Sequence, residues 1–69
     1  MSKEKMNEIL EVRDDFLKNY AWRKGQALFN AIFYIDQDLG NKIRGSEIDP
    51  FYQDERIDKC LDFLKKQGA

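Results

Sequence analysis

Histidine is absent from the 69-residue chain, and cysteine occurs once, at Cys60. A single cysteine excludes an internal disulfide and a cysteine-rich zinc site. Without histidine, the chain also lacks the commonest general base and the residue that normally activates a serine or cysteine nucleophile. These absences predict a protein that is not an enzyme and that binds no metal or cofactor.

A long apolar run is missing too. No stretch approaches the roughly 18 residues of a membrane-spanning helix. The amino terminus alternates charge at Lys3, Glu4 and Lys5 and has no apolar region of the kind found in signal peptides. The sequence therefore predicts a cytoplasmic protein with no membrane association.

Positive charge is also scarce. The net charge is −1, and only residues 21–45 carry an excess of basic side chains, with four basic and two acidic residues. The basic residues are Arg23, Lys24, Lys42 and Arg44. This small surplus is far below the basic surface expected of a general nucleic-acid binder, so a nucleic-acid partner is not favoured.

The residues that are present follow the pattern of a small helical protein. Hydrophobic residues make up 42% of the chain and charged residues 36%, which indicates one foldable domain over residues 1–69. Apolar residues recur at three- and four-residue steps over about 3–19, 22–36 and 54–66. These segments predict three main helices.

Shorter elements are expected between the second and last helices. Residues 36–44 predict a short helix interrupted or started near Gly40, with Gly45 as its C-terminal stop. Asp49 followed by Pro50 predicts a single helical turn. Asp54 is expected to cap the last helix. The predicted fold is thus all-α, a single-domain bundle of three main helices plus one or two short helical turns.

The middle helix is apolar on nearly every side. Such a helix is usually buried by its neighbours or offers a second apolar face to a partner, so residues 27–35 favour a homodimer in a domain this small. A buried strand over residues 31–35 is the competing interpretation, which the segment's length argues against. Helical spacing with Ile57, Leu61 and Leu64 also points Cys60 at a core. The predicted core comprises Leu10, Phe16, Leu17, Leu28, Phe29, Ile32, Ile43, Ile57, Leu61 and Leu64.

Three polar residues, Arg23, Gln26 and Asn30, share one stripe of this apolar helix. A structural interpretation is that the two amides hydrogen-bond the turn at residues 44–46, because buried amides are rarely left unpaired. A functional interpretation is that the stripe belongs to a recognition patch. The two interpretations do not exclude one another.

The recognition patch would include Arg44 and be flanked by Trp22 and Tyr34, since tryptophan, tyrosine and arginine are enriched at interface hot spots. Phe51 and Tyr52 are adjacent to one another beside a proline, so at least one of these rings can be exposed. The simpler arrangement places Phe51 in the core and Tyr52 along the surface.

Thirteen aspartates and glutamates remain as candidates for acid–base work. Paired carboxylates act in this way only when a cleft raises one pKa, and a small helical domain has little interior for a cleft. Asp36 with Asp38, and Asp54 with Asp58, are better interpreted as helix caps and surface charges. Residues 36–41 also lack the ligand spacing and closing glutamate of a calcium loop.

A resemblance covers roughly residues 22 to 61. The chain is similar there to short uncharacterised bacterial and phage-associated helical proteins. The resemblance implies a compact helical fold and a bacterial or phage source, favours action by binding a larger protein, and carries over no catalytic residues. The strings that carry it are Trp22-Arg23-Lys24-Gly25-Gln26, Phe29-Asn30, Ile43-Arg44-Gly45 and Asp49-Pro50-Phe51-Tyr52.

The predicted function is therefore that of a non-enzymatic protein-interaction or regulatory module that binds a larger protein. The alternative is a small nucleic-acid-binding regulator whose short third helix and last helix form a helix-turn-helix, although the last helix is acidic at Asp54, Glu55, Asp58 and Asp62. An enzyme of unrecognised type is a third possibility. The predicted partner surface comprises Trp22, Arg23, Gln26, Asn30, Arg44 and Tyr52.

Overall fold

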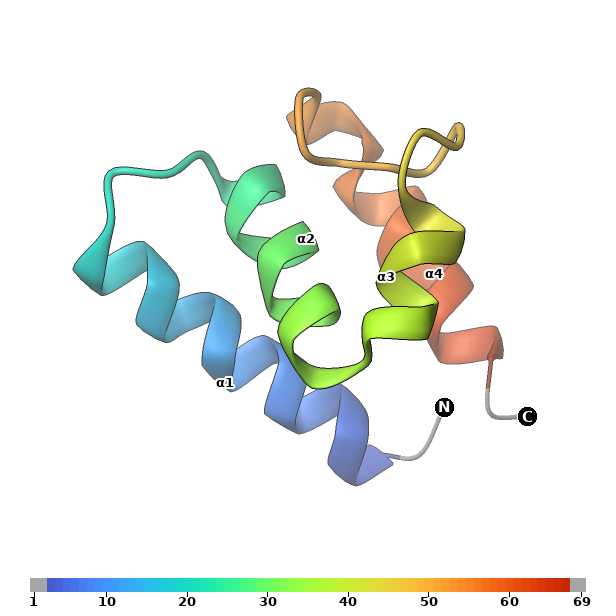
Figure 1. Ribbon diagram of the computed structural model, residues 1–69, viewed down its shortest axis with the longest axis horizontal. Helices are drawn as coiled ribbons and strands as arrows, with labels where there is room; N and C mark the ends of the chain where they lie inside the picture. The colour runs from blue at the N-terminus through green and yellow to red at the C-terminus, as the bar shows by residue number, and fades with distance from the viewer. Residues whose placement is uncertain (1–2, 68–69) are drawn as a thin grey trace.

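The computed structural model describes residues 3–67 and is all-helical over that range, so the predicted fold class is confirmed. Its elements are α1 (Lys3–Asn19), α2 (Lys24–Ile35), α3 (Gln37–Ile43), the 3-10 helix η1 (Asp54–Arg56) and α4 (Ile57–Lys66). Helix α2 is central: it packs against α1, α3, η1 and α4, and Figure 1 shows it between α1 and the α3–α4 pair.

Helix α2 forms because its residues bury apolar side chains on most of its circumference. Leu28 and Ile32 are 0% exposed, and burial of each contributes roughly 1.5–3 kcal/mol. The strand considered for residues 31–35 is wrong, since those residues are helical throughout. Ala27, Phe29 and Ala31 are buried within the chain, whereas Tyr34 is 74% exposed and Phe33 is only partly buried, so the homodimer stays a prediction.

Helix α1 packs against α2 through one stripe of apolar residues. The centre of this stripe differs from the predicted core position, Leu10. Ile9 is fully buried, whereas Leu10 is only half-buried. The reason is the helix phase: Met6, Ile9 and Phe16 follow the line of contact, while Leu10 and Leu17 lie seven residues apart along its edge. The buried core comprises Ile9, Leu28, Phe29, Ala31, Ile32, Leu39, Ile43, Cys60 and Leu64.

Helix α3 lies within the predicted range of residues 36–44, but the expected start or interruption near Gly40 is wrong. The Asp36 carboxylate accepts a hydrogen bond from the Leu39 backbone N–H (3.1 Å), so it is the N-cap. Gly40 lies inside the helix and does not interrupt it. After the helix, Gly45 has a φ of 75°, a left-handed conformation that glycine adopts without steric cost.

The single turn predicted at residues 50–53 forms, but it is not helical. The Gln53 N–H donates to the Pro50 carbonyl oxygen (3.2 Å), which closes the turn. One Asp49 carboxylate oxygen accepts from the Phe51 N–H (2.9 Å), as expected of a capping aspartate, and the other accepts from the Gly45 N–H (2.8 Å). Asp49 therefore fixes the loop between α3 and η1.

Cys60 lies in the core, as its helical spacing predicted. Burial, together with the negative charge of Asp49, raises the pKa of the Cys60 thiol to about 12. The reactive thiolate is therefore scarce at neutral pH, and the residue acts as a packing group. Within residues 3–67, no helix combines the length and the apolar content needed to cross a bilayer.

Candidate partner-binding face

One side of α2 is left uncovered by the other helices. Away from its ends, the residues of α2 that are not buried are Gln26, Asn30, Phe33 and Tyr34. At 100° per residue, these four positions span about a quarter to a third of the circumference. We call these four residues the α2 face.

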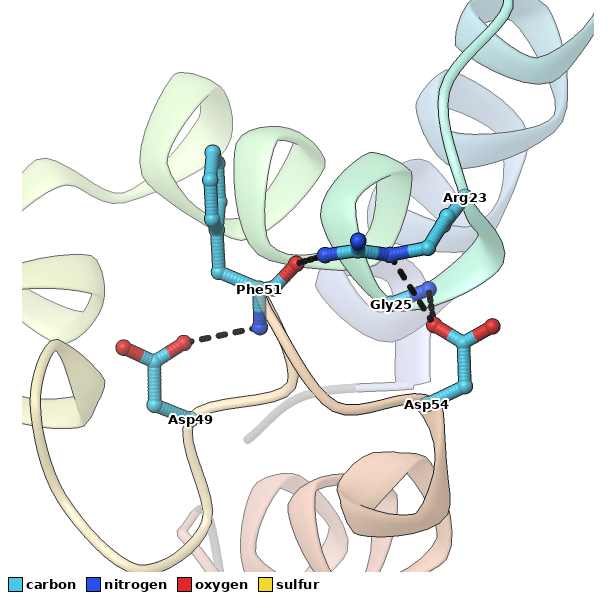
Figure 2. A network of polar contacts seen from close by, with 5 residues as sticks. All are labelled: Arg23, Gly25, Asp49, Phe51 and Asp54. Carbon is cyan, nitrogen blue, oxygen red and sulfur yellow. Dashed lines mark hydrogen bonds and ion pairs between the residues drawn. The ribbon is translucent and has the colours of Figure 1, made fainter.

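The start of α2 is tied to the loop before η1. One Arg23 guanidinium nitrogen donates a hydrogen bond to the Phe51 carbonyl oxygen (2.6 Å), and the Gly25 N–H donates to the Asp54 carboxylate (3.0 Å). Arg23 Nε also lies 4.0 Å from the same carboxylate oxygen. Figure 2 shows the guanidinium between Phe51 and Asp54. We call the two hydrogen bonds the clasp.

Asp54 supplies the side-chain hydrogen-bond acceptor that the N-terminus of α2 lacks. Arg23 occupies the N-cap position, but its side chain makes no capping hydrogen bond. The Asp54 carboxylate accepts from Gly25 in the first turn instead, and its negative charge faces the positive end of the helix dipole. The prediction that Asp54 caps the last helix is therefore wrong, because the carboxylate bonds a helix distant in sequence.

The clasp positions a pair of aromatic rings beside the α2 face. Phe51 packs edge-to-face on Phe29, with ring centroids 5.6 Å apart, and so joins the loop to the core. Tyr52 follows with its ring 4.7 Å from that of Phe51 and is 77% exposed. The predicted arrangement, Phe51 inward and Tyr52 on the surface, is confirmed.

A pocket of about 300 Å³ lies between α2, the end of α3 and this loop. A second hollow of about 260 Å³ adjoins it and shares Arg44, Asp49 and Tyr52. We call the first hollow the Tyr52 pocket. It is lined by Phe29, Asn30, Arg44, Asp49, Phe51 and Tyr52.

Arg44 is held in place at the rim of this pocket. Its guanidinium carbon lies 5.1 Å from the centre of the Phe33 ring, within the range of a cation–π contact. Phe33 belongs to the α2 face, whereas Arg44 follows α3. The contact therefore extends the α2 face onto the end of the next helix.

Aromatic side chains also gather on the α1 side of α2. The Tyr20 and Trp22 rings stack with centroids 4.4 Å apart, and Phe16 makes edge-to-face contacts with both rings and with Tyr34. Tyr20 is 52% exposed and Tyr34 is 74% exposed. We call Phe16, Tyr20, Trp22 and Tyr34 the aromatic cluster.

The structure brings part of the predicted partner surface together. Asn30, Arg44 and Tyr52 line one pocket. Gln26 lies on the same uncovered side of α2 as Asn30. Trp22 lies in the aromatic cluster, away from the pocket.

Arg23 lies beside this surface, but its guanidinium is used within the chain to hold the loop that carries Tyr52. Its role is therefore to position the surface. A substitution at Arg23 would disturb the loop as well as any partner contact.

The structural interpretation of the two amides does not hold. Within residues 3–67, the side chains of Gln26 and Asn30 make no hydrogen bond to the turn at residues 44–46. Asp49 bonds the Gly45 N–H, and the Ser46 hydroxyl donates to the Ile43 carbonyl oxygen (2.6 Å). The amides are half-buried on the α2 face, where both can reach a partner.

Some residues of this surface were not predicted. Phe16 was predicted only as a core residue and Tyr20 was assigned no role, although their four-residue spacing beside Trp22 could have indicated a cluster. Phe33 carries the Arg44 guanidinium, and no local pattern links these two positions. Only the packing of α3 on α2 brings them together.

A larger hollow, of about 330 Å³, lies between α1, α2 and α4. Its apolar lining is Leu17, Leu28 and Ile57. The charged side chains at its edge include Arg13 and Asp14, which form an ion pair with each other at 2.8 Å. None of the residues predicted to contact a partner lines this hollow.

No group of three or more potential ligands among residues 3–67 is arranged to hold a metal ion. Comparison with family models, characterised proteins and solved structures finds no match to this chain. The resemblance to short bacterial and phage-associated proteins stays a prediction. The proposed function therefore rests on the α2 face and the aromatic side chains beside it.

Proposed function

We propose that this protein is a non-enzymatic interaction module that binds a larger protein through the α2 face and the aromatic side chains on both of its edges. The observation that supports the proposal most directly is the exposure of two large rings on this side, 74% for Tyr34 and 77% for Tyr52. Tyr34 and the 52%-exposed Tyr20 both pack on Phe16, and such clustered exposed aromatics, unlike scattered ones, are typical of interaction surfaces.

The arrangement has the chemistry of a protein interface. Each tyrosine can bury roughly 150–250 Å² and still keep its hydroxyl available for a hydrogen bond. Gln26 and Asn30 lie between the two edges and offer amide donors and acceptors that would orient a partner. Apolar burial at the edges with polar contacts in the middle gives both affinity and register.

The alternative, a helix-turn-helix regulator, has less support. Residues 44–56 separate α3 from α4, a much longer connection than the three- or four-residue turn of that motif. Helix α3 packs on α2. In addition, Asp58 and Asp62 on α4 are exposed, and their charges would repel a phosphate backbone.

The buried thiol of Cys60 and the absence of a second cysteine suit a reducing compartment. We place the proposed activity in the cytoplasm on this basis.

Site-specific photo-crosslinking in the source cells tests the proposed surface. A photoreactive phenylalanine analogue would replace Tyr34 or Tyr52, which alters an exposed ring the least. Lys59, an exposed residue of α4, provides the control position. We expect the same protein partner to be crosslinked from positions 34 and 52 and not from position 59.

Nuclease treatment before the analysis separates the two classes of partner. Crosslinks that persist after nuclease support a protein partner. Products that form equally at all three positions, or at none, contradict the proposed surface. Products that disappear with nuclease favour the nucleic-acid alternative.

A further inference from the structure

We infer that the Tyr52 pocket binds an aspartate or glutamate side chain of the partner, so that the partner segment is an acidic peptide with a large apolar residue beside its carboxylate. The inference rests on the proposed function and specifies the chemistry of its partner. It is carried by the placement of Arg44 over Phe33 at the rim of a pocket that also contains Asn30 and Tyr52.

Arg44 is ordered for binding but is not neutralised. The cation–π contact with Phe33 restrains the guanidinium over the ring, which limits the entropy that the long side chain would lose on binding. Within residues 3–67, no carboxylate forms an ion pair with Arg44, and the residue is exposed. Its N–H groups can therefore donate to a carboxylate in bidentate fashion.

The acidic residues nearest the pocket are already engaged. Both carboxylate oxygens of Asp49 accept backbone hydrogen bonds, from Gly45 and Phe51. Asp54 is bonded to Gly25. These hydrogen bonds hold both carboxylates against the loop and the first turn of α2, and within residues 3–67 neither forms an ion pair with Arg44.

A second guanidinium borders the adjoining hollow. Arg56 contributes to its lining and donates a hydrogen bond to the Ser46 carbonyl oxygen (3.2 Å). Around the two hollows, the charges of Arg44 and Arg56 exceed the single negative charge of Asp49. An acidic group of a ligand would thus meet a local positive excess, although the whole chain has a net charge of −1.

The remaining walls explain why an apolar neighbour is expected. Phe29 and Phe51 supply ring surface, and the exposed Tyr52 ring can cover an apolar side chain of the partner. The Asn30 amide and the Tyr52 hydroxyl can donate additional hydrogen bonds to the carboxylate. A carboxylate beside an apolar group matches both parts of the pocket.

A short peptide fits these charges better than a nucleic acid does. A peptide can place one carboxylate at Arg44 and direct uncharged residues elsewhere. A phosphate chain carries a negative charge at each nucleotide and would also approach Asp49, which lines the same pocket. Repulsion there would oppose the attraction at Arg44.

The test uses two blocked dipeptides and nuclear magnetic resonance of the ¹⁵N-labelled full chain. The probe is acetyl-Glu-Phe-amide, and its neutral control is acetyl-Gln-Phe-amide. We expect the acidic peptide to shift the side-chain signals of Asn30 and Arg44. The neutral peptide should bind about tenfold more weakly, because hydrogen bonds to a charged acceptor are the stronger ones.

Matched variants locate the interaction. Arg44→Gln should lose binding of the acidic peptide to the level of the neutral one, and Arg44→Lys should bind with intermediate affinity, because lysine keeps the charge but not the bidentate geometry. Lys42→Gln removes the same charge from an exposed residue of α3 that does not line the pocket, and it should bind like wild type. Circular dichroism of each variant verifies the fold.

Several results would overturn the inference. These are equal binding of the two peptides, acidic binding that survives Arg44→Gln, or an oligothymidylate that shifts the same signals at lower concentration. If the acidic peptide fails while positions 34 and 52 still crosslink a protein, the inference alone is lost. If the crosslinks fail as well, the proposed function is lost with it.

Discussion

Gly25 lies where the first turn of α2 meets the loop before η1. A Cβ atom at this position would lie 2.1 Å from the Pro50 carbonyl oxygen and 2.9 Å from the Asp54 carboxylate. The Pro50 oxygen belongs to the backbone and already accepts from Gln53, so it cannot move aside independently. The close approach of the two segments therefore requires glycine.

We expect Gly25→Ala to lower the free energy of unfolding by roughly 1–3 kcal/mol, the usual cost of forcing extra atoms into a packed site, even though alanine favours helix. Urea denaturation measures the change. Gly45→Ala is the comparison, because it meets no atom within 4 Å but must adopt a φ of 75°, which costs about 1–2 kcal/mol. A Gly25→Ala protein as stable as wild type would contradict the close approach.

At the scale of single residues, local patterns identified some roles and not others. Spacing placed Cys60 in the core, and residue type marked Asp36 as a cap and Gly45 as a stop. Arg23 and Asp54 were assigned other roles, because their partners lie 28 and 29 residues away along the chain. Residue type alone does not indicate which distant backbone group a side chain bonds.

Helix α3 is the element most dependent on a single side chain. It has only seven residues, and Asp36 both caps its N-terminus and pairs with Lys5 of α1. The hydrogen bond from Lys5, followed by the bond from the Leu39 N–H, lowers the pKa of Asp36 below its ordinary value of 3.8. The ionised carboxylate is therefore favoured in the folded state.

This shift has a definite sign in a stability–pH profile. A lowered pKa in the folded state stabilises the protein above pH 3.8, and that stabilisation is lost as the pH falls through the lower folded value. We expect Asp36→Ala to cost about 1 kcal/mol at pH 7 through loss of the cap. Asp36→Asn, which keeps a capping oxygen but loses the charge, should cost less.

Thermal unfolding between pH 2 and pH 7 distinguishes the two contributions. The difference between wild type and Asp36→Asn should shrink below pH 3.8, as the wild-type carboxyl becomes protonated. A difference that does not change with pH would show that the charge of Asp36 contributes nothing to stability.

At the scale of elements, periodicity was informative where a helix has one apolar stripe or is apolar throughout. It predicted the bounds of α1 and α2 closely, and it predicted that a short helix, α3, follows them. It was less informative between residues 49 and 56, where Asp54 and Arg56 bond backbone groups of other segments and the helix starts four residues later than Pro50. Proline and aspartate together mark a turn, but the packing partner determines which turn forms.

At the scale of the whole molecule, α2 determines both the fold and the proposed binding surface. Short connections join α2 to the helices next to it in the sequence. Residues 20–23 lead from α1 to α2, and the single residue Asp36 leads from α2 to α3. The C-terminal part of the chain returns to α2 across a longer loop. The α2 face stays uncovered because the other elements all pack on the remaining sides.

The sequence predicted the composition of this surface better than its layout. The polar stripe, Arg44 and Tyr52 were predicted from the sequence. The contact between Arg44 and Phe33 depends on how three segments pack, and so does the separation of Trp22 from the pocket that Tyr52 lines. Such relationships between distant residues have no signal in a single sequence.

The clasp also has a consequence for the order of folding events. Its hydrogen bonds join residues that lie 28 and 29 positions apart in the sequence. The contacts between α1 and α2 instead begin beside the connection at residues 20–23, where the Phe16 and Trp22 rings meet, so these helices can start to associate by closing a short loop. Since closing a longer loop costs more entropy, the neighbouring helices should associate first and the clasp should form after the rate-limiting step.

Arg23→Ala should then accelerate unfolding by a factor of roughly 2 to 10 and leave the refolding rate nearly unchanged. Stopped-flow measurements in urea separate the two rates, and a variant that refolds more slowly would place the clasp in the folding nucleus.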